Sequence, residues 1–177
     1  MDWKMLSKTR VAGFLAVVLS VACLAGCSVS YKLNGASIDY ATTKTIEIAD
    51  FPLRSAYVWA PMHHMFNNEL SDIYARQTKL SQVKRNGDLQ LSGEITEYSQ
   101  FNKAVSADGY SSQTQLKMTV NVRFVNNKKH ADDFERTFTA TAEYDASQQL
   151  TAVQEELVTQ MIKDIVDQIF NATVANW

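Results

Sequence analysis

The chain has 177 residues, of which 17 are Lys or Arg and 19 are Asp or Glu, so its formal net charge is −2. A balance this close to neutral offers no polybasic surface and argues against nucleic-acid binding. Both cysteines, Cys23 and Cys27, lie near the N-terminus. The rest of the chain therefore has no disulfide, no cysteine metal site and no cysteine nucleophile.

The first residues have the pattern of an export signal. Lys4, Lys8 and Arg10 form a cationic start, and residues 11–22 are mostly apolar. This apolar run is shorter than the roughly 20 residues of a membrane-spanning helix. The alternatives are an ordinary transmembrane anchor or a secretory signal peptide that happens to contain a cysteine. The cationic start and the short apolar run disfavour both.

The apolar run ends in Leu24, Ala25, Gly26 and Cys27. A leucine three positions before a cysteine, with two small residues between, resembles the lipobox of bacterial lipoprotein precursors. The resemblance implies cleavage between Gly26 and Cys27 and attachment of the acyl chains to Cys27.

We therefore expect three parts: a removed signal peptide (1–26), a lipidated N-terminus and tether (27–43) and a folded domain (44–177). The signal peptide takes three basic and one acidic side chain with it. The mature chain then carries 14 basic and 18 acidic side chains, a net charge of about −4.

A short strand and a helix are predicted first. Residues 45–49 alternate, with Ile46 and Ile48 on one face, and a proline at position 52 ends the strand because it cannot donate to a ladder. Pro61 suits a first helical position, and the helix should fade around residues 77–80. Its apolar residues recur at steps of three and four: Met62, Met65, Phe66, Leu70, Ile73 and Tyr74.

Three strands are predicted next, around residues 89–96, 116–124 and 134–144. A loose stretch (99–112) separates the first two, and a polar hairpin loop (126–132) separates the last two. The strands alternate too cleanly to be buried on both faces. Their polar side is either solvated or a wet contact surface inside a partner, and it comprises Gln90, Ser92, Thr96, Lys117, Thr119, Asn121, Thr137, Thr139 and Thr141.

A long helix completes the domain. Thr151 and Gln154 have the spacing of a capping box, and Glu155 and Glu156 are expected where the helix dipole favours anions. A wide apolar stripe follows. The element order predicts an α+β fold: a two-layer sandwich with two helices packed on one face of a four-stranded mixed sheet.

No catalytic or metal site is expected. His63 and His64 are adjacent, so on a helix their rings point about 100° apart and cannot converge on one ion. His130 lies in the polar hairpin loop. The spacing of zinc proteases, the nucleophile elbow and a phosphate-binding glycine loop are all missing from the sequence. We expect a protein that is not an enzyme.

A series of short blocks runs through nearly the whole mature chain. They are Gly26-Cys27 with Tyr31, residues 35–38, residues 44–48 with Phe51-Pro52, and residues 77–80, 87–98, 119–124 and 169–177. In these blocks the chain resembles the LptE family of lipopolysaccharide-assembly lipoproteins, in the form found in Bacteroidetes-type bacteria.

The resemblance implies a β-α-β-β-β-α sandwich that plugs an LptD-type outer-membrane β-barrel, assists its assembly and supports lipopolysaccharide transport to the cell surface. It also implies an outer-membrane location on the periplasmic side, held by a diacylglycerol and an N-acyl chain on Cys27, with no other cofactor. The alternative function is a lipid-tethered periplasmic domain that binds glycan or cell wall.

Basic side chains contact lipopolysaccharide in relatives of this family, as the resemblance implies. Four cations lie on the polar sheet face and in its hairpin loop, and we take them as candidate contacts to lipopolysaccharide or the partner: Lys117, Arg123, Lys128 and Lys129. Ordinary solubilising charge is the alternative reading of these residues.

Overall fold

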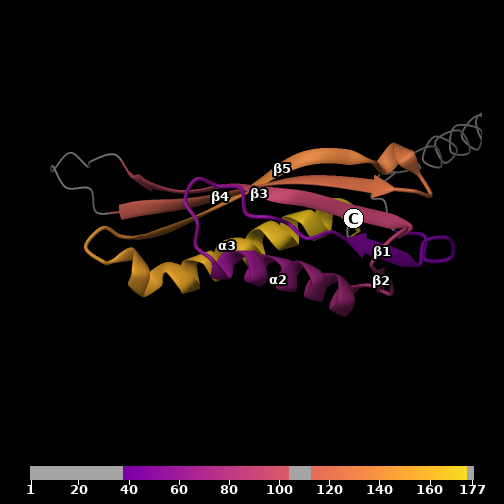
Figure 1. Ribbon diagram of the computed structural model, residues 1–177, viewed down its shortest axis with the longest axis horizontal. Helices are drawn as coiled ribbons and strands as arrows, with labels where there is room; N and C mark the ends of the chain where they lie inside the picture. Colours follow the sequence, from indigo (N-terminus) through magenta and orange to yellow (C-terminus); the bar gives the residue numbers. More distant parts are fainter. Residues whose placement is uncertain (1–37, 104–112, 175–177) are drawn as a thin grey trace, which may run out of the picture. The chain divides into compact units, whose positions relative to one another are not determined.

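Two helices pack on one face of a five-stranded mixed sheet in the computed structural model, which describes residues 38–103 and 113–174 (Figure 1). The elements in chain order are β1 (Thr45–Ile48), α2 (Pro61–Gln77), β2 (Ser81–Val83), β3 (Leu89–Asn102), β4 (Gln113–Asn126), the 3-10 helix η1 (His130–Asp132), β5 (Phe134–Asp145) and α3 (Leu150–Thr173). The strand order is β2-β1-β3-β4-β5. Strand β1 is parallel to both neighbours, whereas β3, β4 and β5 form an antiparallel meander.

The predicted α+β class, the mixed sheet and the placement of both helices on one face are confirmed. The sheet has one strand more than the four expected. This strand, β2, is only three residues long, and two of its residues are exposed. It was missed because three residues cannot display an alternating pattern, and its pairing with β1 is a tertiary contact.

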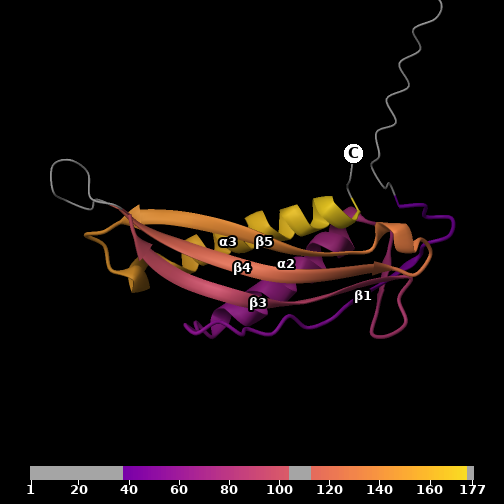
Figure 2. The same ribbon diagram turned by 90° about the horizontal axis from the view of Figure 1, so that it is seen from above.

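The core lies between the helices and the sheet. Helix α2 starts at Pro61, as predicted, and ends at Gln77. The sheet contributes the apolar side of each long strand, including Leu91, Ile95 and Val120, all at most 1% exposed. Figure 2, turned by 90° from Figure 1, shows the side of the sheet that faces away from the helices, with both helices behind it. Nothing among the described residues packs over that side of β3, β4 and β5, which we call the open face.

The start of α3 differs from the prediction. The helix begins at Leu150 with Gln149 as its N-cap, and no side chain caps it. Thr151 is thus already inside the helix and makes no capping box, and the first turn contains no acidic residue. Gln154 is instead buried, at 5% exposed, and donates to the hydroxyl of Tyr98 at 3.0 Å.

Strands β3 and β4 are longer than predicted, because residues 99–102, assigned above to a loose stretch, pair with residues 114–117. A β-bulge between Ile95 and Glu97 shifts the register. Beyond it, Tyr98 rather than Glu97 points to the helices and is 2% exposed. The bulge therefore inverts the alternation that made the first part of β3 readable from the sequence.

The last residues of the predicted tether lie against the domain. Ile38 packs on the core, and Thr43 is 4% exposed. The lipobox residues Gly26 and Cys27 lie outside the described residues, so their predicted cleavage and acylation stay predictions.

Candidate partner-binding surface

The open face has a hydrogen-bonded carboxylate at its centre. Glu97 Oε2 accepts from Lys117 Nζ at 2.8 Å and from Thr119 Oγ1 at 3.0 Å, and its Oε1 accepts from Ser99 Oγ at 2.8 Å. The bond from Lys117, followed by that from Ser99, lowers the pKa of Glu97 although partial desolvation raises it. Glu97 is thus an ionised partner that neutralises Lys117 within the face.

Glu97 was not among the residues singled out from the sequence. The bulge after Ile95 brings Glu97 onto the open face, directly opposite Thr119 and two pairs along the ladder from Lys117. The available signal was the break in alternation at Thr96 and Glu97, which is typical of a bulge.

Hydroxyl and amide groups cover the face around this pair. Thr119 and Thr139 are cross-strand neighbours with their hydroxyl oxygens 3.4 Å apart, and Thr137 donates to Asn121 Oδ1 at 2.8 Å. Towards the β3–β4 loop a second ion pair joins Lys103 to Glu143 at 2.6 Å. The hydrogen bond from Lys103 is the main reason that the pKa of Glu143 is lowered.

Arg123 lies at the other end of the open face, on β4, and its side chain makes no ion pair within the described ranges. Glu135 is its cross-strand neighbour on β5. Arg123 is exposed, so its charge is available to an external anion.

The other two predicted cations lie beyond the face, in the loop that joins β4 to β5. Lys128 Nζ is 2.9 Å from Asp88 Oδ1, and Lys129 Nζ is 2.6 Å from Asp132 Oδ1. The structure therefore brings Lys128 and Lys129 together and separates them from Lys117. Three of the four predicted contact residues already have a carboxylate partner.

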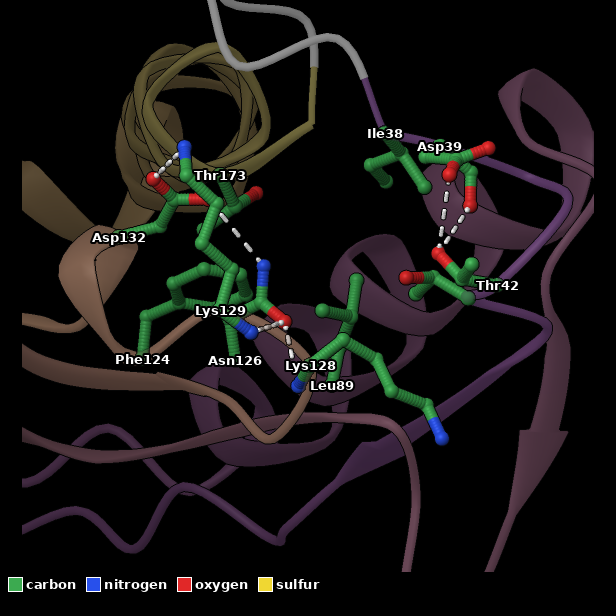
Figure 3. A pocket seen from close by; sticks show the side chains of 11 residues that line it. Ile38, Asp39, Thr42, Leu89, Phe124, Asn126, Lys128, Lys129, Asp132 and Thr173 are labelled. Atoms are coloured by element: carbon green, nitrogen blue, oxygen red, sulfur yellow. Dashed lines mark hydrogen bonds and ion pairs between the residues drawn. The ribbon is translucent and has the colours of Figure 1, made fainter.

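Lys128 and Lys129 line a cavity of about 260 Å³, seen from close by in Figure 3. Its walls come from residues 38–43, the start of β3, the end of β4 with the β4–β5 loop, and the end of α3. Asp39 and Asp132 share the lining with the two lysines, while Leu89 and Phe124 contribute apolar surface. Acidic groups beside the lysines make the cavity a poor site for a strongly anionic group.

The histidines are not arranged as metal ligands. His63 Nε2 lies 2.9 Å from Asp50 Oδ2, and His64 meets the His63 ring edge-on. Across the part of the chain that the structure describes, no three His, Cys, Asp or Glu side chains lie close enough together to hold a metal. Neither helix of that part is long and apolar enough to cross a membrane.

Comparison with known protein families gives one match. Residues 43–173 match the model of the LptE family, described as lipopolysaccharide-assembly. No curated protein matches the chain.

Two solved structures with TM-scores above 0.5 share the fold, and a third structure is less similar. A minor lipoprotein from Acinetobacter baumannii is 16% identical, with a TM-score of 0.51, covering 76% of this chain and 94% of the other. A protein from Xanthomonas campestris is 12% identical, with a TM-score of 0.51, covering 76% and 85%. The rare lipoprotein B of Shewanella oneidensis is 12% identical, with a TM-score of 0.47, covering 71% and 92%.

Proposed function

Because this chain belongs to the LptE family of lipopolysaccharide-assembly lipoproteins, which is not a family of enzymes, we propose that its domain plugs an LptD-type outer-membrane β-barrel. In this role it assists assembly of the barrel and supports transport of lipopolysaccharide to the cell surface. The open face of β3, β4 and β5 is the surface that meets the lumen of the barrel.

The observation that carries this proposal is the chemistry of the open face. Its centre is a hydrogen-bonding surface in which Lys117 and Glu97 neutralise one another 2.8 Å apart. The lumen of an outer-membrane barrel is polar. Because the two charges at the centre of the face pair with one another, this centre can enter such a lumen without leaving an isolated charge desolvated, which would cost several kcal/mol.

The proposed location is the periplasmic side of the outer membrane, with the lipid attached at Cys27. Eleven residue steps separate Cys27 from Ile38, the first described residue. An extended segment of that length spans up to about 40 Å. Such a reach would let the domain enter a barrel from the periplasm while its lipid stays in the membrane.

Contact with lipopolysaccharide is proposed chiefly at Arg123. A phosphate that binds Lys117, Lys128 or Lys129 has to compete with Glu97, Asp88 or Asp132. Arg123 makes no ion pair among the described residues, so its acidic neighbours Asp133 and Glu135 compete less directly. Its guanidinium can hold a phosphate through two parallel hydrogen bonds.

Pull-down of the tagged protein from detergent-solubilised outer membranes tests the proposal. We expect a large β-barrel protein to co-purify. The double variant Ser92→Trp with Thr141→Trp adds bulk to the open face and should cut the recovered barrel strongly, since a packed contact cannot absorb two indole rings. Gln160→Trp with Asp167→Trp adds the same bulk to the outer side of α3 and should leave recovery unchanged.

Recovery of the wild-type protein without any barrel partner would overturn the proposal. If both double variants recover the barrel equally well, the open face is not the surface that contacts the barrel. Depletion of the protein separates this function from glycan or cell-wall binding, because only the former predicts loss of surface lipopolysaccharide and accumulation of unfolded barrel.

A further inference from the structure

Strand β5 forms one edge of the sheet and is long and regular. It pairs with β4 from Phe134 to Asp145 without a register shift. In an antiparallel pair, opposite residues alternate between hydrogen-bonded and non-hydrogen-bonded positions. The backbone N–H and C=O groups of every second residue of β5 therefore point away from β4, towards the outside of the sheet.

A hydrogen bond at this edge identifies the outward set. Gln168 of α3 donates from Nε2 to the carbonyl oxygen of Thr139, at 3.4 Å. Thr139 thus presents its backbone outwards, and by the two-residue repeat so do Thr137 and Thr141. At 3.4 Å the bond from Gln168 is long for N–H···O, so a better donor can replace it.

Exposed sheet edges are commonly protected by short length, by proline, by lysine or by a bulge. The opposite edge follows this rule, because β2 has only three residues. Strand β5 has twelve residues and contains neither proline nor lysine. Its single cation, Arg136, lies near the start of the strand, 4.9 Å from the centre of the Phe134 ring. The central Thr and Ala residues of β5 therefore have no cation or proline among them to block the pairing of another strand.

The charges around this edge are acidic. Glu135 and Glu143 flank the central threonines on the open face, and Asp164 is exposed on α3, one helical turn before Gln168. Glu143 already pairs with Lys103 at 2.6 Å, so an incoming cation has to share this carboxylate with Lys103. These charges disfavour a second copy of the chain. An antiparallel β5–β5 pair centred on Thr139 would place Glu135 opposite Glu143 twice, and like charges directly opposite one another are destabilising.

We propose that the β5 edge accepts an added strand from another protein, an extended segment with β-branched residues at its centre and lysine or arginine opposite Glu135 and Glu143. Main-chain hydrogen bonds to Thr137, Thr139 and Thr141 supply the affinity, and the flanking carboxylates set the register. This interaction uses the main chain at the edge of the sheet, and it shares only the carboxylates of Glu135 and Glu143 with the open face.

The experiment uses the full-length lipidated protein in detergent and a fluorescent synthetic peptide as long as β5. The peptide has Thr and Val at its centre and Lys at the two positions that oppose Glu135 and Glu143, and a second peptide has Glu at those positions. Fluorescence anisotropy should show binding of the lysine peptide and at least about tenfold weaker binding of the glutamate peptide.

Thr141→Pro removes one outward N–H group and should lower the affinity for the lysine peptide by about tenfold. Proline is tolerated on an edge strand where the N–H faces solvent. Thr141→Val keeps this N–H and should bind like wild type. Should Thr141→Pro fail to fold, Glu135→Lys serves instead. This variant should bind the lysine peptide more weakly and the glutamate peptide more tightly than wild type does.

No binding of the lysine peptide, or equal binding by the Thr141→Pro and Thr141→Val variants, would overturn the proposal. So would a wild-type dimer in sedimentation that Thr141→Pro converts to a monomer, because the occupant of the edge would then be a second copy.

Discussion

The carboxylate of Asp88 at the start of β3 lies 2.9 Å from the ammonium group of Lys128, in the loop between β4 and β5. Its other oxygen accepts the backbone N–H groups of Lys44 at 2.9 Å and Thr45 at 3.1 Å. One side chain therefore joins the beginning of β1, the beginning of β3 and the β4–β5 loop. The hydrogen bond from Lys44, and then that from Lys128, holds the pKa of Asp88 well below its ordinary value of 3.8.

Asp88→Asn should lower the free energy of unfolding at pH 7 by about 1–3 kcal/mol, because the backbone N–H groups of Lys44 and Thr45 lose a charged acceptor. The folded-state pKa of Asp88 is depressed. Its contribution is therefore present above the unfolded-state value and is lost as the pH falls below about 3.8 towards the folded-state pKa. Urea unfolding of both proteins at pH 7 and pH 3 should show the difference shrinking at the lower pH.

The control for Asp88 is Asp72→Asn. Asp72 faces Arg76 at 3.5 Å on the exposed side of α2, where an ion pair contributes at most about 1 kcal/mol. Equal losses for the two variants, or a loss for Asp88→Asn that does not change with pH, would contradict the role given to Asp88.

Gly93→Ala should destabilise the domain by about 1–3 kcal/mol through overpacking. A Cβ atom on Gly93 would lie 2.5 Å from Cε1 of Phe51 and closer still to the carbonyl oxygen of Asn121. Phe51 is fully buried and packs on Phe66, so it cannot move aside freely. Thermal unfolding measures the loss, and Ser92→Ala, one residue away, should unfold within a few degrees of wild type.

Gln154→Leu should cost about 1–3 kcal/mol, because it removes the group that donates to the buried Tyr98 hydroxyl at 3.0 Å. Burial of Tyr98 already raises the pKa of this hydroxyl. The exposed Gln160→Leu on the same helix is the matched control in chemical denaturation. A stabilised Gln154→Leu protein would show that apolar packing outweighs the hydrogen bond.

Glu97→Ala should leave folding nearly unchanged but reduce recovery of the barrel partner. Both side chains of the pair remain about one-third exposed, so the pair contributes at most about 1 kcal/mol to stability. Its loss, however, leaves Lys117 unpaired on the contact surface. The double variant Glu97→Lys with Lys117→Glu restores the pair and should restore recovery. A Glu97→Ala protein that recovers as much barrel as wild type would contradict this role.

The block from Gly87 to Tyr98, one of those that carry the family resemblance, has a physical basis in these contacts. Asp88 joins three segments, Gly93 makes room for Phe51, and Tyr98 reaches Gln154. Each of these three residues is in contact with a residue far away in the sequence. The sequence shows which amino acids stand at positions 88, 93 and 98, but only the folded structure shows which contacts require them.

The sequence by itself determined the elements with strong periodicity: both helices, the parts of β3, β4 and β5 that alternate, and the α+β class. Side-chain spacing decides which face of such an element is apolar, and burial of that face outweighs other local preferences. The resemblance to the LptE family was also visible in the sequence, and the match of the family model to residues 43–173 confirms it.

Tertiary structure alone decided the rest. The fifth strand exists because Ser81–Val83 lies beside β1, and α3 begins at Leu150 without the capping box that Thr151 indicated. The bulge after Ile95 brings Glu97 beside Lys117, and Asp88 and Asp132 pair with the two loop lysines. Pairing between distant residues depends on how the elements pack. Periodicity could therefore locate the cations but could not show that Lys117, Lys128 and Lys129 have carboxylate partners, whereas Arg123 makes no ion pair among the described residues.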